Sequence, residues 1–150
     1  MGNLLMADID IAMDAVTGEI TETPHDPVPL DELRDNMLDR LAGRRWIAET
    51  GGIIVGGAPI KTDRESQAVL TRAYVQASGN PEFTARWKVG RGMFVTLDAA
   101  TILAVGDAVT SHVQVCFNRE DELTGEILAA HAAEDREALE AIDLDAGWPG

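Results

Sequence analysis

The chain has 150 residues, of which 45% are apolar, so it has the size and composition of one globular domain with a single core. Its formal net charge of −14 repels a phosphate backbone and disfavours nucleic-acid binding. A single cysteine excludes an intrachain disulfide, and no apolar run approaches the roughly 18 residues of a membrane span, so we expect a protein made in the cytoplasm without a membrane span.

The first 29 residues are expected to form an arm. Residues 5–14 alternate apolar and acidic side chains, which is the pattern of a half-buried strand, and residues 19–22 can return as a second strand after Gly18. Three prolines in residues 23–29 predict an extended connector. Because a lone two-stranded hairpin is marginal in water, the arm should lie against the rest of the chain or against another subunit.

The next segments predict two helices and two short hairpins. Residues 30–49 have helical apolar spacing and end at Gly51-Gly52. A hairpin is expected over residues 53–61, and then Thr62 and Glu65 form a capping box that opens a helix to about residue 78. Residues 83–96 predict the second hairpin, with its turn at Gly90-Arg91-Gly92.

Residues 97 to about 133 contain no proline and keep a mixed spacing of three and four between apolar residues. This pattern predicts a helix of roughly 50 Å, with a break plausible near Gly125. Such a helix is too long for one small domain to cover, so part of it should pack on another chain. Residues 134–145 can extend it as an acidic segment.

The sequence therefore predicts a mostly helical α+β fold with an N-terminal β-hairpin arm, two short hairpins and three helices. We divide it into residues 1–29 (arm and Pro-rich connector), 30–133 (α+β domain) and 134–150 (acidic C-terminal extension). Charge is uneven: residues 1–30 carry six acids and no Lys or Arg, and residues 99–150 carry eleven acids and two bases. The acidic ends could dock on the near-neutral middle of a neighbouring copy.

No catalytic, cofactor-binding or metal-binding constellation can be assembled, so we expect no enzyme. His112 and Cys116 share one helix face, but two ligands do not make a zinc site. We interpret them as a buried, hydrogen-bonded histidine and a small core hydrophobe. On the exposed acidic helix, His131 with Glu134 and Asp135 is more simply a solvated pair.

Basic residues beside aromatics are the best candidates for contact with a partner, because Arg and Trp are enriched in binding hot spots. The alternative is a solvated edge with the tryptophans packed inward. Together with the apolar face of the long helix and the C-terminal tryptophan, the candidate partner or oligomer contacts are Arg44, Arg45, Trp46, Trp87, Arg91, Ile102, Val109, His112, Val113, Cys116 and Trp148.

Several blocks in the middle of the chain resemble a known bacteriophage domain family. They are Glu49-Thr50-Gly51-Gly52-Ile53, Ile60-Lys61-Thr62-Asp63-Arg64-Glu65-Ser66, Trp87-Lys88 with Gly92 to Ile102, and His112 to Phe117. The resemblance covers about residues 44–130, in order and spacing. The family is a domain of unknown function found in tail-fibre-associated and tail-assembly proteins of tailed phages and prophages. It implies a role in the virion or its assembly and no catalytic residues.

The resemblance and the long helix lead to a functional expectation. The chain should be a structural or adaptor component of a phage tail, at the tail tip, baseplate or tail-fibre attachment, made in the host cytoplasm and retained in the virion. It should bind other tail proteins and form a homo-oligomer through its long helix, with a trimer favoured because tails have threefold and sixfold symmetry. The alternative is a tail-fibre assembly chaperone that is not retained in the virion.

Overall fold

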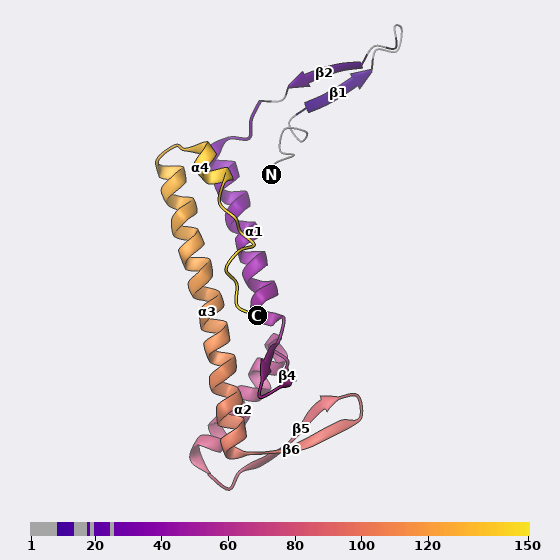
Figure 1. The fold of residues 1–150 in the computed structure, drawn as a ribbon, viewed down its shortest axis with the longest axis vertical. Coiled ribbons are helices and arrows are strands. Elements are labelled where there is room, and N and C mark those ends of the chain that lie inside the picture. Colours follow the sequence, from indigo (N-terminus) through magenta and orange to yellow (C-terminus); the bar gives the residue numbers. More distant parts are fainter. Residues whose placement is uncertain (1–8, 14–17, 19, 25) are drawn as a thin grey trace.

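The computed structural model describes residues 9–13, 18, 20–24 and 26–150, with side chains described from residue 26 onward. Two long helices, α1 (Leu30–Thr50) and α3 (Ala99–Ala132), lie side by side and antiparallel along the long axis (Figure 1). The helix α2 (Arg64–Gly79) packs on the first half of α3. The predicted mostly helical α+β fold is confirmed.

The strands form three separate antiparallel hairpins in the part of the chain that is described. The predicted arm is confirmed for its backbone: β1 (Ile9–Met13) pairs with β2 (Ile20–Pro24). The predicted strand residues 5–8, 14 and 19 lie outside the described residues. The second hairpin joins β3 (Ile53–Val55) to β4 (Ala58–Ile60).

The third hairpin joins β5 (Thr84–Gly90) to β6 (Met93–Asp98), and β6 runs directly into α3. Its turn contains Gly92 at φ +72°, a left-handed backbone conformation that favours glycine. The hairpin projects sideways from the end of the molecule where α3 begins (Figure 1).

The predicted capping box at the start of α2 is wrong. The N-cap is Asp63, whose carboxylate accepts from the Ser66 N–H at 2.9 Å and from the Ser66 hydroxyl at 2.6 Å. Thr62 is turned inward instead. Its hydroxyl donates to the Glu49 carbonyl at 2.6 Å and accepts from the Gly52 N–H at 2.9 Å. Thr62 therefore links the end of α1 to the start of α2.

The long helix is confirmed and has 34 residues, about 50 Å by its rise per residue. It begins after Asp98, whose carboxylate caps the helix by accepting from the Thr101 N–H at 2.8 Å. It runs through Gly125 without the break that we considered. By length and composition α3 could cross a membrane. Polar residues such as Asp107, Ser111 and Gln114 point outward along it, so we interpret it as a packed helix of a folded domain.

The predicted extension of this helix through residues 134–145 is wrong. α3 ends at Ala132, and Glu134 takes a left-handed φ of 53°, which reverses the chain. A fourth, short helix, α4 (Arg136–Glu140), follows. The last residues then run back along α1 (Figure 1). Residues 134–150 are therefore folded onto the domain.

Two regions of apolar packing lie one after the other along α3. The first joins α1, the second half of α3 and the C-terminal segment, and contains Met37, Leu41, Leu123, Ile127, Leu139 and Leu144. The second joins α2 to the first half of α3 and contains Leu70, Ala73, Ala77, Ile102, Val105 and Val109. The inward face of α3 is thus covered by elements of its own chain, and a companion chain is not required to bury it.

Candidate contact site

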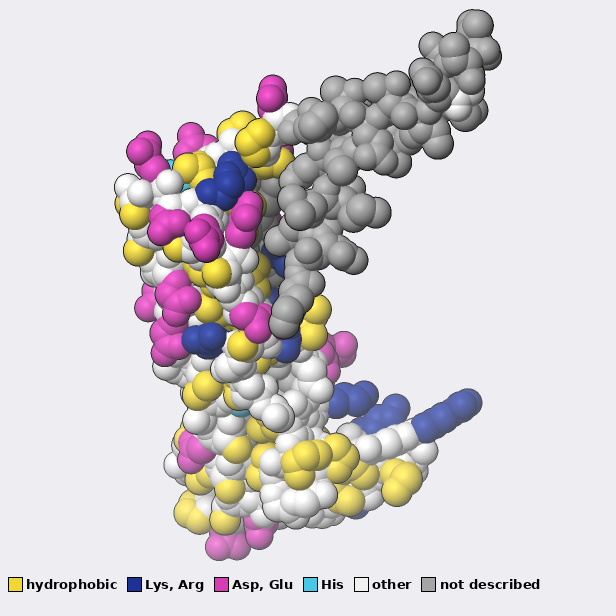
Figure 2. Space-filling view, turned by 45° about the horizontal axis from the view of Figure 1, so that its top comes forward, with side chains coloured by type: hydrophobic (Ala, Val, Ile, Leu, Met, Phe, Trp, Pro, Cys, Tyr) yellow, Lys and Arg dark blue, Asp and Glu magenta, His cyan; other side chains and the backbone are white. Residues whose placement is uncertain are grey.

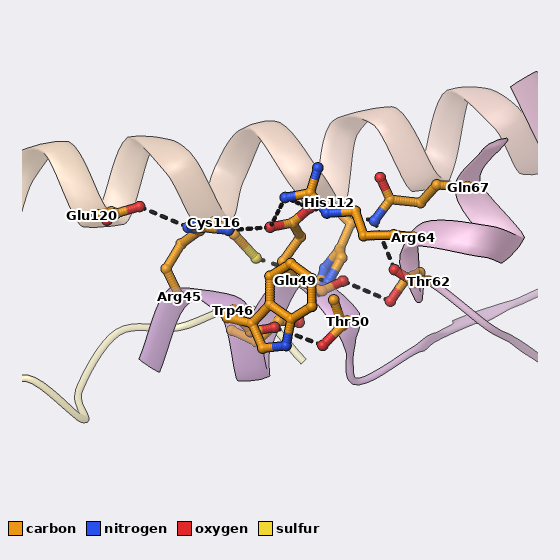
Figure 3. A network of polar contacts seen from close by, with 11 residues as sticks. Arg45, Trp46, Glu49, Thr50, Thr62, Arg64, Gln67, His112, Cys116 and Glu120 are labelled. Atoms are coloured by element: carbon orange, nitrogen blue, oxygen red, sulfur yellow. Dashed lines mark hydrogen bonds and ion pairs between the residues drawn. The ribbon is translucent and has the colours of Figure 1, made fainter. Parts of the chain in front are cut away.

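A buried polar junction joins α1, α2 and α3 at the middle of the molecule (Figure 3). Its centre is Glu49, in the last turn of α1, whose side chain has no solvent exposure. Two guanidinium groups surround its carboxylate, from Arg45 one turn earlier on α1 and from Arg64 at the start of α2. A buried carboxylate is tolerated only when its charge is paired in this way.

Each carboxylate oxygen of Glu49 is contacted by two polar side chains. Oε1 forms an ion pair with Arg64 Nη2 at 2.9 Å and accepts a hydrogen bond from Gln67 Nε2 at 3.3 Å. Oε2 accepts from Arg45 Nη1 and, at 3.1 Å, from Arg64 Nη2. Arg45 then extends the network to α3, because its Nε donates to Glu120 Oε2 at 2.7 Å. Two acids and two bases make the junction neutral overall.

The aromatic and α3 residues around the junction are also in contact. The guanidinium carbon of Arg45 lies 4.5 Å from the centre of the Phe117 ring, and that of Arg64 lies 5.2 Å from the Trp46 ring. These are cation–π distances. Burial alone would lower the pKa of Arg45, but hydrogen bonds to Glu120 and Glu49 raise it above its ordinary value. Arg45 is therefore a permanent cation.

His112 and Cys116 sit under this junction on α3, as interpreted from the sequence. His112 Nε2 lies 2.9 Å from the Ala48 carbonyl, so this nitrogen carries the proton and donates. Cys116 has no solvent exposure, and its sulfur lies 3.8 Å from the same nitrogen. Burial, and then the charge of Glu49, raise the pKa of the Cys116 thiol. Both residues therefore fill the core.

The junction is a structural link with its donors and acceptors already matched. Among residues 26–150, no buried side-chain nitrogen or oxygen lacks a hydrogen-bond partner. In the same part of the chain, no three His, Cys, Asp or Glu residues come together as metal ligands. His131 does not face Glu134 and Asp135; its Nε2 lies 2.6 Å from Asp31 Oδ1 on α1. The residues that a partner can reach lie on the surface.

The β5–β6 hairpin carries that surface. Trp87 pairs with Val95 and Ala85 with Leu97. Of these four side chains, Ala85, Trp87 and Leu97 pack against the helices, whereas Val95 is exposed. Lys88 pairs with Phe94 on the opposite face. The strand register is irregular between Lys88 and Gly90, and no further strand among the described residues pairs with this hairpin. In that part of the chain, both outer edges keep backbone donors and acceptors without strand partners.

Large apolar side chains near the hairpin tip are unusually exposed. The exposed fractions are 52% for Val89, 63% for Met93 and 51% for Phe94, with Val95 at 38%. Several large apolar side chains exposed at one end of a folded protein indicate a contact surface. We define the hairpin surface as these four residues together with the three exposed bases of the same hairpin, Arg86, Lys88 and Arg91.

The three bases give the hairpin a positive charge (Figure 2). Arg86 donates to the Thr96 hydroxyl at 3.0 Å. Within the described chain, none of Arg86, Lys88 and Arg91 has an acidic partner within ion-pair distance. Figure 2 shows basic side chains along the projecting hairpin, whereas acidic side chains gather over the opposite end, near α4. The hairpin surface is thus both apolar and cationic on an acidic protein.

The predicted contact residues fall into three groups. Arg91 and Trp46 are exposed, so a partner can reach them; Trp46 therefore does not pack inward, whereas Trp87 does. Half-buried are Arg44, Arg45, Trp87, Val113 and Trp148. Buried inside the chain are Ile102, Val109, His112 and Cys116. In this conformation the last four belong to the core of one copy, because α1 and α2 cover them.

Trp148 and Arg44 hold the C-terminal segment against α1. The Trp148 indole N–H donates to the Leu144 carbonyl at 2.8 Å, and Arg44 lies over the ring at 5.4 Å from its centre. Arg44 also pairs with Asp145 at 3.3 Å. This tryptophan anchors its own chain. Val113 instead lines an open groove of about 430 Å³ between α2 and α3.

Sequence reasoning missed the residues that matter most in both places. It did not single out Glu49, Arg64 or Glu120 as a network, although the spacing of Arg45 and Glu49 by four is a signal for an ion pair on a helix. On the hairpin it named Trp87 and Arg91 but not Met93 and Phe94. Alternation within strands does not tell which apolar face is left uncovered.

The protein is thus a mostly helical α+β domain, built on one long helix, with an exposed hairpin that is apolar and cationic. The chain belongs to the family described as Domain of unknown function (DUF4376), whose model matches residues 32–146. The match includes α4 and most of the C-terminal segment, in agreement with their place in the core. Comparisons with curated proteins and with solved structures found no match.

Proposed function

We propose that this chain is a structural or adaptor component of a tailed-phage tail, at the tail tip, baseplate or tail-fibre attachment, and acts by binding neighbouring proteins. The link to phage tails is supported by the sequence blocks within residues 44–130 that resemble tail-fibre-associated and tail-assembly proteins. The binding role is supported by the hairpin surface.

The observation that carries the proposal is the exposure of Met93 and Phe94 on a hairpin that pairs with no other strand between residues 26 and 150. The inner face of this hairpin packs on α2 and α3, but the apolar side chains near its tip are exposed, and that exposure carries a solvation cost. The cost is relieved when a partner covers the tip. The bases beside the patch supply orientation and attraction for an acidic partner surface.

The proposal is tested by mass spectrometry of phage particles purified from a host that carries the gene. We expect the chain in the particles at a fixed ratio to the other tail proteins. Its presence in the lysate together with tail fibres, but not in finished particles, would favour the assembly chaperone instead. Its absence from particles and from every complex with a tail protein would contradict both roles.

A pair of variants links the particle to the hairpin surface. Phe94→Ser removes an exposed apolar side chain of the patch, and Leu128→Ser removes an equally exposed one on α3. Because both side chains already face solvent, neither change should unfold the protein. We expect Phe94→Ser to reduce incorporation into particles and Leu128→Ser to leave it unchanged. Equal incorporation of both variants would show that the hairpin surface is not the attachment point.

A further inference from the structure

The two hairpins at opposite ends of the molecule have complementary charge. The β1–β2 arm lies beyond the start of α1, and the β5–β6 hairpin lies at the start of α3 (Figure 1). Residues 1–26 carry six acids and no Lys or Arg, whereas the hairpin surface carries three bases. Among the strands that the structure describes, each hairpin is a two-stranded sheet with no further strand at its outer edges.

The arm cannot reach the hairpin surface of its own chain. The connector from Pro24 to Leu30 spans at most about 21 Å, and a strand of five residues adds about 17 Å. The start of α1 lies beside the far end of α3, so the β5–β6 hairpin is about one α3 length away, roughly 50 Å. Only another copy can therefore bring an arm to this surface.

We propose that the β1–β2 arm of one copy docks on the β5–β6 hairpin of the next copy and extends it into an intermolecular sheet. The unpaired backbone groups at the hairpin edges are then satisfied by a neighbouring strand. By sequence, the arm brings acids to a hairpin that carries the bases Arg86, Lys88 and Arg91, and its alternating Ile9, Ile11 and Met13 bring apolar residues to a hairpin with exposed apolar side chains.

This contact deepens the proposed structural role by naming how copies associate. It joins two different surfaces, head to tail, so successive copies form a closed ring if the rotation between them closes and a filament if it does not. A ring of three copies satisfies the trimer expected from tail symmetry.

The test is self-association of the full chain by sedimentation velocity. We expect oligomers that weaken as salt is raised, because salt screens the charges between the two hairpins. The hairpin variant Arg86→Glu, Lys88→Glu, Arg91→Glu should raise the dissociation constant at least about tenfold, since like charges then face each other. The matched control, Arg40→Glu, Lys61→Glu, Arg72→Glu, changes the same number of exposed charges elsewhere and should leave association nearly unchanged.

A charge exchange makes the test specific. The arm variant Asp8→Lys, Asp10→Lys, Glu19→Lys, Glu22→Lys should also fail to associate on its own. Equimolar mixing of the arm variant with the hairpin variant should restore association, because each then carries the hairpin that the other arm needs. Circular dichroism of each variant checks that it is folded.

Three results would overturn the inference: a full chain that stays monomeric at every concentration, equal weakening by hairpin and control variants, or no recovery on mixing two folded variants. None of them bears on the presence of the chain in purified particles. A monomer that still enters particles would remove the contact between copies and leave the proposed function standing.

Discussion

At the residue scale, Glu49 places a full negative charge where solvent does not reach it. The cost of removing a carboxylate from water is several kcal/mol, so its partners must offset it. Arg45 and Arg64 do so from two different helices, and Gln67 completes the set. The pairing fixes the end of α1 against the start of α2.

We predict that Glu49→Gln destabilises the folded protein by about 3 kcal/mol. The substitution keeps the shape of the side chain but removes its charge, and the new amide nitrogen faces donors. Urea unfolding followed by circular dichroism measures the change. Glu122→Gln removes the acid of an exposed ion pair with Arg119 and should change the unfolding free energy little. Similar losses in the two variants would contradict the prediction.

Asp63 gives the second residue-scale prediction, a dependence of stability on pH. Hydrogen bonds from the hydroxyl and the backbone N–H of Ser66 hold the pKa of Asp63 below its ordinary value of 3.8. A carboxylate with a depressed pKa stabilises the fold fully above its ordinary pKa, and this contribution is lost as pH falls through the lower, folded-state value.

The variant Asp63→Asn keeps a capping oxygen but cannot titrate. We expect wild type to be the more stable of the two at pH 6, with the difference shrinking below about pH 4. Ser66→Ala removes the hydroxyl hydrogen bond that contributes most to the lowered pKa of Asp63, so the stability of this variant should change less with pH. The urea midpoints of the variants are measured at pH 6 and below pH 4. An equal difference in midpoint between wild type and Asp63→Asn at the two pH values would contradict the prediction.

At the element scale, α3 contains two glycines in opposite surroundings. A Cβ on Gly106 would lie 2.3 Å from Cδ2 of Tyr74, whereas a Cβ on Gly125 would meet no atom within 4 Å. Gly106 therefore lets α2 approach α3 closely, at the point where the Tyr74 hydroxyl donates to Asp107 at 2.7 Å. Gly125 has no such role.

The two glycines should respond to alanine with opposite signs. Gly106→Ala forces the Tyr74 ring to move and should destabilise the protein by about 1–2 kcal/mol despite better helix propensity. Gly125→Ala reduces the freedom of the unfolded chain and should stabilise it by about 0.5–1 kcal/mol. Thermal unfolding of the two single variants measures both effects. A stabilising Gly106→Ala would show that the helices do not pack as closely as described.

At the scale of the whole molecule, α3 passes through both apolar regions, and the Glu49 junction lies between them. Neither region can lose its packing without exposing part of the same continuous helix. We therefore expect the domain to unfold as one cooperative unit.

Single-tryptophan variants check this cooperativity. Trp46→Phe with Trp87→Phe leaves Trp148, which packs on the α1–α3 region, and Trp46→Phe with Trp148→Phe leaves Trp87, which packs on the α2–α3 region. In each variant, fluorescence and circular dichroism should give the same urea midpoint. A tryptophan signal that changes before the circular dichroism would show that its region unfolds separately.

Features set by local spacing could be predicted from the sequence. The run without proline predicted α3, and the glycine turns predicted the hairpins. The apolar neighbours of His112 predicted that this residue is buried. The start of α2 shows the limit of such reasoning. Thr62 and Asp63 are both good capping residues, and Asp63 is the cap because the Thr62 hydroxyl is held by Glu49 and Gly52.

By itself, the sequence determined the uneven charge and most of the helices and hairpins, because each of these depends on residues close together in the chain. Only the tertiary structure decided which segment covers each apolar face. α1 and α2 bury the inward face of α3, Leu139 and Leu144 return to the core, and Met93 and Phe94 are left outside. Burial depends on which distant segment packs against a face, and helical or strand periodicity carries no information about that.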